Sequence, residues 1–264
     1  MKFTKMQGLG NDYVYLHCSG AVPDDLPALA RRLSDRHFGI GSDGLILILP
    51  SAQADFHMQM FNADGSEGLM CGNGIRCVGK YVYDKRLTNH TALRIETASG
   101  IKDITLTISD ENTVAAVSVD MGGAVIENTI SIRFAGKDYR FTPVAVGNPH
   151  LVCFVDDVSA APVETLGAQL QADARFSGGI NVEFLQIHRS DYASMRVYER
   201  GSGETLACGT GACAAFAVAE SLKLLKPQAT LALLGGELSL TLRTDGHILM
   251  TGNAVTVFEG DIQI

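Results

Sequence analysis

Two segments of this chain repeat one pattern of residues that could carry out proton transfer. Residues 67–74 read E-G-L-M-C-G-N-G and residues 204–211 read E-T-L-A-C-G-T-G, so both fit E-x-x-x-C-G-x-G. Cys71 and Cys208 are separated by about half of the 264 residues. Each motif runs into an apolar stretch with helical spacing, which predicts a thiol at the start of a helix in each half.

A thiol at such a position is suited to acid–base chemistry. The first backbone N–H groups of a helix lack partners within the helix, and the helix dipole adds partial positive charge there. Both effects favour a thiolate and also create a site for a carboxylate. We therefore predict one active site in which a thiolate removes the α-proton of an amino acid. The opposite thiol then delivers a proton to the other face, while helix N–H groups stabilise the developing charge.

The competing interpretation is that both cysteines are structural, because free cysteine is among the most buried residue types. The repetition, with Glu at the same offset, favours function for Cys71 and Cys208. We expect the other four cysteines to be core residues: Cys18, Cys77, Cys153 and Cys213. Within each motif and its helix the cysteines lie five or six residues apart, wider than the usual zinc spacing, so no metal site is expected. A long chain without a signal peptide also disfavours disulfides.

Composition limits the partners of the protein. The formal net charge is −8, the pI is near 5.3, and no stripe of Lys and Arg appears, which argues against nucleic acid. The N-terminal residues lack the apolar core of a signal peptide. The longest apolar run, residues 212–225, is too short to span a bilayer and contains Glu220 and Lys223. We predict a cytoplasmic enzyme that binds a small molecule and no membrane.

Strand patterns dominate both halves and helices are few. Apolar and polar residues alternate over residues 55–60, 104–108, 130–134 and 238–242, with hairpin turns expected at 135–138 and 244–247. Helices are predicted over residues 24–34, 73–85, 162–174 and 210–224. The last of these is rich in alanine, which suits a helix that is packed closely on all sides.

These elements predict an α+β fold of two pseudo-symmetric domains. Each would be a curved, mainly antiparallel, barrel-like sheet wrapped around a central helix, with the active site in the cleft between the domains. Residues 1–115 would carry Cys71 and residues 116–253 would carry Cys208. The last strand, residues 254–264, would return to the first domain.

The same residues resemble those of the diaminopimelate epimerases, a family of cofactor-independent amino-acid epimerases. The similarity rests on both cysteine motifs and on five shorter segments: residues 8–12, 61–67, 147–150, 181–184 and 199–203. It implies an isomerase that interconverts LL-2,6-diaminopimelate and meso-diaminopimelate in lysine and peptidoglycan-precursor biosynthesis. It implies neither pyridoxal phosphate nor any other cofactor, and it is consistent with a homodimer.

The resemblance also implies roles for individual residues. Cys71 and Cys208 would be the acid/base thiols, with His150 and Glu199 adjusting their pKa values. Backbone N–H groups of Gly72, Asn73, Gly209 and Thr210 would bind the reacting carboxylate. The remaining substrate contacts would come from Asn11, Asn62, Asn148, Asn181, Glu199 and Arg200, with Arg200 on the distal carboxylate. A planar guanidinium suits a carboxylate, and Asn offers both a donor and an acceptor.

One position departs from the family pattern. Where Gly44 stands, some relatives have a Gln that contributes to the substrate site, so Gly44 is left out of the predicted site. Three alternative functions remain open at this stage. The chain could be a racemase of another amino acid, a redox protein in which Cys71 and Cys208 form a regulatory disulfide, or a binding module without chemistry.

Overall fold

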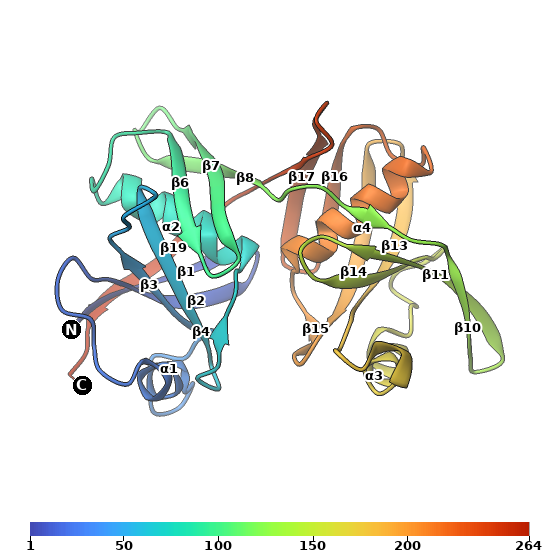
Figure 1. Cartoon of the computed structure of the whole chain (residues 1–264), viewed down its shortest axis with the longest axis horizontal. Coiled ribbons are helices and arrows are strands. Elements are labelled where there is room, and N and C mark those ends of the chain that lie inside the picture. Colours follow the sequence, from blue (N-terminus) through green and yellow to red (C-terminus); the bar gives the residue numbers. More distant parts are fainter. Residues whose placement is uncertain (264) are drawn as a thin grey trace. The chain divides into compact units, whose positions relative to one another are not determined.

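A computed structural model describes residues 1–263 of the chain and divides it into two compact units (Figure 1). Unit 1 contains Met1–Val119 and the segment from Gly252 onward, and unit 2 is Asp120–Thr251. Ile264, the last residue of the strand predicted over 254–264, lies outside the described residues. The structural division falls after Val119, and the sequence pattern places it near residue 115.

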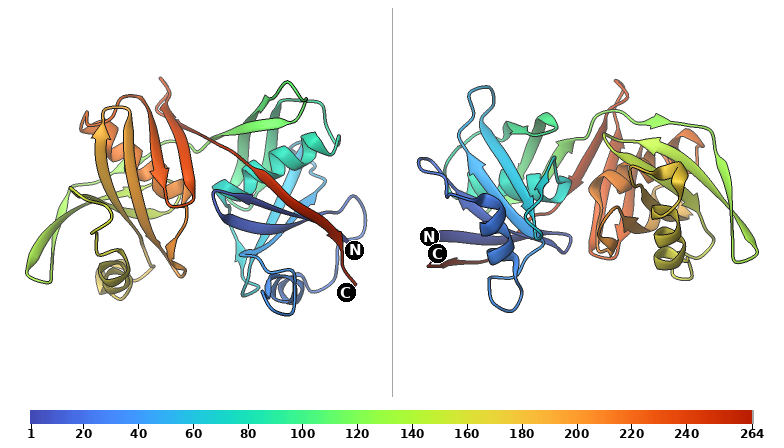
Figure 2. Two further views of the ribbon diagram at one scale, coloured as in Figure 1. Left: turned by 180° about the vertical axis from the view of Figure 1, so that it is seen from behind. Right: turned by 60° about the horizontal axis from the view of Figure 1, so that its bottom comes forward.

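Unit 1 contains one curved sheet in which β2 and β3 are parallel, β4 and β6 are parallel, and all other neighbours are antiparallel. Across the sheet the order is β19 (Val255–Asp261), β1 (Lys2–Gly8), β2 (Asn11–His17), β3 (Gly44–Leu49), β4 (Phe56–Asn62), β6 (Ala92–Thr97), β7 (Gly100–Ile108) and β8 (Val114–Asp120). The short β5 (Glu67–Gly68) pairs with the end of β4. Figure 2 shows β19 beside the N-terminal strand, with both chain ends in this unit.

Unit 2 repeats this topology strand for strand. The order is β10 (Ile130–Phe134), β11 (Lys137–Ala145), β12 (Pro149–Phe154), β13 (Asn181–Arg189), β14 (Tyr192–Glu199), β16 (Gln228–Leu233), β17 (Gly236–Leu242) and β18 (Ile248–Gly252). Here β12 and β13 are parallel, as are β14 and β16. The short β15 (Gly203–Thr205) pairs with the end of β14, and β9 (Val125–Ile126) pairs with the end of β11.

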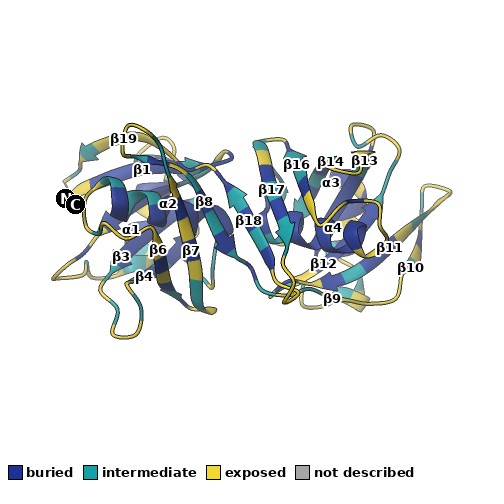
Figure 3. Cartoon of the chain, turned by 90° about the horizontal axis from the view of Figure 1, so that it is seen from above, coloured by how far each residue is buried: buried dark blue, intermediate teal, exposed yellow. Residues whose placement is uncertain are grey.

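Each sheet curls around one helix. In unit 1, α2 (Gly72–Asp84) contacts β1 and β2 near one end of the sheet and β7 near the other. In unit 2, α4 (Gly209–Ser221) contacts β11, β12 and β13 as well as β16 and β17. Figure 3 shows both helices almost entirely in the colour of buried residues. The predicted fold of a sheet around a central helix in each half is therefore confirmed.

A second helix in each unit packs elsewhere on its sheet. The helix α1 (Leu26–Ser34) contacts β3 and β4, and α3 (Val163–Gln171) contacts β13 and β14. A separate 3-10 turn, Ala174–Phe176, follows α3. The predicted helix over 162–174 therefore ends earlier, at Gln171.

The central helices end in the same way. The last backbone carbonyls of α2 accept hydrogen bonds from N–H groups of residues up to Thr88, and those of α4 from residues up to Leu225. Arg86 and Lys223 both adopt the left-handed conformation, with φ of 59°, which cannot continue a helix. For this reason α4 stops at Ser221, three residues before its predicted end.

The strand β3 has no counterpart among the predicted elements. Its sequence, G-L-I-L-I-L, is apolar throughout, and its first five residues are buried. A strand buried on both faces lacks the alternation that marks a half-exposed strand. The four alternating segments, in contrast, do form strands, and both expected turns join antiparallel neighbours.

The packing around α4 predicts a large effect of core truncation. Phe216 lies on α4 and is fully buried, so Phe216→Ala should lower the free energy of unfolding by about 3–5 kcal/mol. Urea denaturation followed by circular dichroism measures the change. Leu234→Ala is the control, because Leu234 is 56% exposed in the turn between β16 and β17. Equal losses in the two variants would contradict this account of the core.

Candidate active site

Cys71 is the N-cap of α2 and holds the sulfur at the start of the helix. Its backbone is extended, with φ −130° and ψ 118°, and the Gly74 N–H donates to Sγ at 3.3 Å. The Cys71 thiol in turn donates to Oδ1 of Asn11, at 3.2 Å. The thiol is only partly buried, so it is both hydrogen-bonded and accessible.

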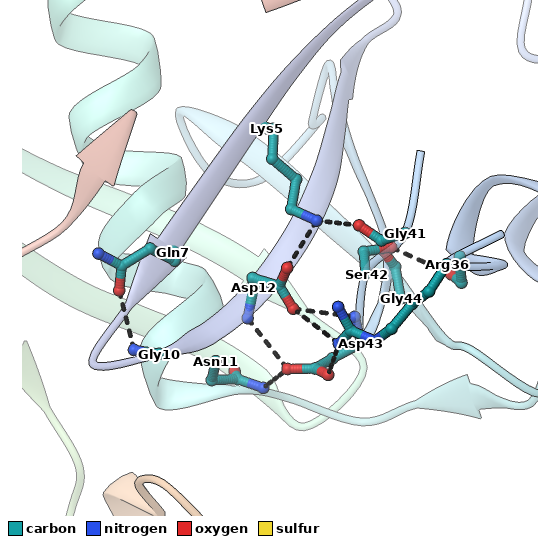
Figure 4. A network of polar contacts seen from close by, with 11 residues as sticks. Lys5, Gln7, Gly10, Asn11, Asp12, Arg36, Gly41, Ser42, Asp43 and Gly44 are labelled. Atoms are coloured by element: carbon teal, nitrogen blue, oxygen red, sulfur yellow. Dashed lines mark hydrogen bonds and ion pairs between the residues drawn. The ribbon is translucent and has the colours of Figure 1, made fainter. Parts of the chain in front are cut away.

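The Asn11 amide is held in one orientation by an acidic residue that the sequence did not single out. Nδ2 of Asn11 donates to Oδ2 of Asp43 at 3.0 Å (Figure 4), which leaves Oδ1 to accept from Cys71. Asp43 also accepts from the Asp12 backbone N–H at 3.0 Å and pairs with Arg36 at 3.1 Å. Lys5 pairs with Asp12 at 2.6 Å and completes the network.

The other predicted residues of unit 1 have more local partners. The Asn73 side chain is buried and accepts from Arg76 at 2.8 Å, while Arg76 also donates to the Gly72 carbonyl at 3.1 Å. These contacts fix the first turn of α2 from the inside. Asn62, at the end of β4, donates to Oγ of Ser66 at 3.0 Å.

Gly44 leaves room for an aromatic ring. A β-carbon at this position would collide with the carbonyl oxygen of Phe61 and would lie 2.7 Å from Cε1 of Tyr13. A longer side chain at position 44 therefore does not fit while Tyr13 keeps its place. The Tyr13 ring thus occupies part of the space that a Gln side chain at position 44 would need.

Cys208 repeats the geometry of Cys71 in unit 2. It is the N-cap of α4, with φ −118° and ψ 113°, and its Sγ accepts from the Gly211 N–H at 3.4 Å. Oγ1 of Thr210 lies 3.5 Å from the same sulfur. The Glu199 carboxylate accepts from the Thr205 hydroxyl, and its charge acts on the Cys208 thiol. Cys208 is 6% exposed, which makes it more buried than Cys71.

His150 and Glu183 form a fully buried pair beneath this thiol. Nδ1 of His150 lies 2.7 Å from Oε1 of Glu183, and Nε2 lies 2.9 Å from Oδ1 of Asn148. Oε2 of Glu183 is buried without a hydrogen-bond partner in the described part of the chain. A β-carbon at Gly211 would lie 2.6 Å from Oε1 of Glu183, so only glycine lets the carboxylate pack against the first turn of α4.

This surrounding keeps Cys208 protonated. Burial raises the pKa of the Cys208 thiol well above its usual value, and the charges of Glu199 and Glu183 raise it further. The Thr210 and Gly211 contacts act in the opposite direction. Burial also raises the pKa of Glu199. Both shifts follow from removing charged groups from water and placing like charges together.

Asn181 and Arg200 occupy the edge of this cluster. The buried Asn181 amide donates to the Pro149 carbonyl at 3.0 Å and accepts from the Arg200 backbone N–H at 3.0 Å. The Arg200 side chain is exposed and donates to the Gly178 carbonyl at 3.2 Å. Among residues 1–263, no carboxylate forms an ion pair with Arg200.

The glutamates of the two motifs shape the loops before the helices. Glu67 lies on β5 and accepts from Gln59 at 2.8 Å, whereas Glu204 lies on β15 and pairs with Arg196 at 2.6 Å. The remaining cysteines (Cys18, Cys77, Cys153 and Cys213) are buried. Burial raises the pKa of Cys77 to about 11, as expected for a core thiol.

Sequence reasoning omitted two acidic residues of this site, Asp43 and Glu183. Glu183 lies within the segment 181–184 and Asp43 directly precedes Gly44, but a carboxylate that contacts another side chain rather than a ligand leaves no spacing signal. Among the described residues no three His, Cys, Asp or Glu side chains gather as a metal ion would require. None of the helices described over residues 1–263 has the length and hydropathy needed to cross a bilayer.

The chain is similar to known proteins over its whole length. The profile of the family described as Diaminopimelate epimerase matches residues 3–127 and 142–257. A diaminopimelate epimerase of Acetivibrio thermocellus is 45% identical, covering 100% of this chain and 99% of the relative. One from Methanococcus maripaludis strain C6 is 47% identical, covering 100% of both chains.

Solved structures share the fold at low sequence identity. A phenazine biosynthesis protein of the PhzF family from Bacillus anthracis superposes with a TM-score of 0.78 at 14% identity, covering 100% of this chain and 99% of that one. A hydroxyproline epimerase from Agrobacterium vitis gives 0.72 at 15% identity, covering 99% and 90%. The fold is thus common to several proteins, whereas the sequence match is specific. The chain belongs to the diaminopimelate epimerase family.

Proposed function

We propose that this chain interconverts LL-2,6-diaminopimelate and meso-diaminopimelate by proton transfer at one α-carbon. The observation that carries the proposal is the repeated placement of a thiol as the N-cap of a buried helix, once in each unit. Family membership makes the chain an epimerase and names the substrate that its relatives act on. The reaction belongs to lysine and peptidoglycan-precursor biosynthesis.

The helix N-termini are assigned to the carboxylate of the reacting centre. Gly72 and Asn73 are the first residues of α2, and Gly209 and Thr210 are the first of α4. Backbone N–H groups of the first turn of a helix lie at the positive end of its dipole and point toward a ligand bound there. Hydrogen bonds to the carboxylate become stronger as the α-carbon loses its proton, because charge moves onto the carboxylate oxygens.

The proton balance requires two thiols in opposite states. The thiolate forms an S–H bond as the Cα–H bond breaks, and the electron pair moves toward the carboxylate as an enediolate. The second thiol then loses its proton to the opposite face of the α-carbon and becomes a thiolate. No proton is gained or lost overall, and the two sulfurs exchange roles.

We assign Cys208 as the resting acid and Cys71 as the resting base. Burial and the charges of Glu199 and Glu183 raise the pKa of Cys208, which favours its thiol form. Cys71 is less buried than Cys208, and its sulfur contacts the neutral Asn11 amide and the Gly74 N–H. Each cysteine is thus the N-cap of a buried helix, but the charged groups that act on the two sulfurs differ.

Arg200 is proposed to recognise the distal carboxylate. The Arg200 side chain is exposed and can reach a ligand, while the Asn181 side chain holds the Arg200 backbone in place by a hydrogen bond. A charged distal end explains selectivity for diaminopimelate over proline-like amino acids. Asn11, Asn62 and Asn148 are proposed to contact the remaining polar groups of the substrate.

The setting of the enzyme is also part of the proposal. We place the enzyme in the cytoplasm, because thiols that act as acid and base need a reducing compartment. The net charge of −8 gives no basis for binding nucleic acid. The resemblance to its family supports a homodimer.

Replacement of either thiol should abolish turnover. Cys71→Ser and Cys208→Ser should each lower the rate of epimerisation by at least about a hundredfold, since general acid or base catalysis contributes that much or more. Incorporation of deuterium from heavy water into diaminopimelate, proline, glutamate and histidine measures both rate and selectivity. Cys18→Ser, which changes a core thiol, should keep its activity. Normal epimerisation by both site variants would refute the two-thiol mechanism, and turnover of another amino acid alone would refute the substrate.

Removal of the Arg200 charge should act on binding. Arg200→Gln should raise KM for diaminopimelate by about tenfold or more with a smaller change in kcat, because a charge-assisted hydrogen bond to the non-reacting end is lost. Arg189→Gln is the matched control, since Arg189 is an exposed arginine that pairs with Asp191 on the same sheet. An unchanged KM in Arg200→Gln would show that another residue binds this end.

The charge of Glu199 should be visible in the titration of Cys208. In a Cys71→Ser background, Glu199→Gln should shift the pH midpoint of Cys208 alkylation downward, because removal of a nearby negative charge favours the thiolate. Peptide mass analysis after iodoacetamide treatment at a series of pH values gives the midpoint. Glu220→Gln, at the far end of α4, should leave it unchanged. An upward shift in Glu199→Gln would reverse the assigned sign.

A further inference from the structure

We propose that Tyr13 is the hydrogen-bonding partner of the Cys71 sulfur in unit 1, at the position that corresponds to His150 in unit 2. Its hydroxyl would donate to this sulfur whenever the sulfur is a thiolate. The inference rests on the function proposed above, because it gives Tyr13 a part in the proton transfer assigned to Cys71. It adds a residue that neither the motifs nor the resemblance pointed to.

The topological repeat places Tyr13 and His150 at equivalent points. Tyr13 lies near the start of β2, which pairs with β1 in an antiparallel manner. His150 lies near the start of β12, which pairs with β11 in the same manner. Each of these strands pairs in parallel with the next long strand. Tyr13 stands opposite Gly44 on β3, and His150 stands opposite Asn181 on β13.

The neighbours of the two residues also correspond. Asn11 precedes Tyr13 by two positions, as Asn148 precedes His150. Tyr13 and Asn11 lie on the same face of β2, and Asn11 in turn contacts Cys71, whereas His150 Nε2 lies 2.9 Å from Oδ1 of Asn148. Asn11 and Cys71 both act on the pKa of the Tyr13 phenol, Asn11 lowering it and Cys71 raising it. An asparagine and a ring with a polar tip therefore recur in both units.

The ring of Tyr13 packs against the backbone of Gly44, where a side chain on residue 44 would collide with it. The nearest side-chain atom to a β-carbon at Gly44 would be Cε1 of Tyr13, at 2.7 Å, and the ring is otherwise enclosed, with Tyr13 5% exposed. A buried phenol hydroxyl needs a partner. The partners within reach are the Asn11 amide and the Cys71 sulfur.

The hydroxyl can serve both protonation states of Cys71. In the thiol state, the Cys71 S–H donates to Oδ1 of Asn11 at 3.2 Å. Asn11 cannot turn its Nδ2 toward a thiolate without losing its bond to Asp43. The Tyr13 O–H, which rotates freely about its C–O bond, supplies the donor instead. Burial raises the pKa of Tyr13 well above 10, so the phenol keeps its proton at neutral pH.

Other titratable groups face this pair and bear on any pH profile. The charge of Asp43 acts on Tyr13, and Tyr15 and Cys77 interact with Cys71 from β2 and α2. Burial raises the pKa of Tyr15 well above 10 and that of Cys77 to about 11. Neither group titrates near neutral pH, so the midpoint of Cys71 can be followed without interference from them.

The test measures the thiolate of Cys71 directly in the full-length chain. In a Cys208→Ser background, alkylation of Cys71 by iodoacetamide is followed across pH by peptide mass analysis. Tyr13→Phe should shift the midpoint upward by about one pH unit, a tenfold change in the acid constant, because hydrogen bonds to charged groups are worth at least that much. Tyr83→Phe is the matched control. Tyr83 lies near the C-terminal end of α2, far along the helix from Cys71, and its hydroxyl donates to Asn112. This variant should leave the midpoint unchanged.

Two outcomes separate the possibilities. An unshifted midpoint in a folded Tyr13→Phe variant, as judged by thermal melting, overturns the inference. If this variant does not fold, a ring-fluorinated tyrosine placed at position 13 decides the matter, because its stronger donor should move the midpoint downward. Alkylation needs no substrate, so this result stands apart from the proposed function. Failure of the wild-type chain to epimerise diaminopimelate would refute that function alone.

Discussion

The hydrogen bond from the third backbone N–H of a helix to a cysteine sulfur organises both halves of this protein. Cysteine is not among the favoured N-cap residues, so its use at both Cys71 and Cys208 points to chemistry rather than to helix stability. The bond requires glycine at the third position, because Ile46 and Glu183 pack where a β-carbon of Gly74 and Gly211 would lie. It also requires a sheet that wraps the helix and fixes its first turn.

The two units share one backbone arrangement, but the charged residues around their cysteines differ. The two sheets have the same order of parallel and antiparallel pairs, and the two helices end with the same left-handed turn. The carboxylates of Glu199 and Glu183 act on Cys208, and Glu183 is paired with His150, whereas the Cys71 sulfur contacts the neutral Asn11 amide. A reaction that needs one acid and one base at any moment gains from this difference, because identical surroundings would give both thiols the same proton affinity.

Much of the fold and of the site could be predicted from the sequence. The repeated motif placed each thiol at the start of a helix, and alternation located four strands, β4, β7, β10 and β17. The buried strand β3 was missed because it has no alternation, and α4 ends early because of a left-handed Lys223 that no local pattern marks. Asp43 and Glu183 contact other side chains of the site, so only the three-dimensional register of β2 with β3 and of β12 with β13 reveals them. The catalytic and substrate-binding roles of all the site residues remain predictions.

Because of β19, unit 1 is built from two separate segments of the chain, whereas unit 2 is built from one. Unit 2 is one continuous segment, whereas unit 1 is closed by β19, which pairs with β1 from the opposite end of the sequence. During synthesis, unit 2 therefore has all of its strands before unit 1 does. The edge of β1 stays open until residues 255–261 leave the ribosome, so the unit that carries Cys71 is completed after the other.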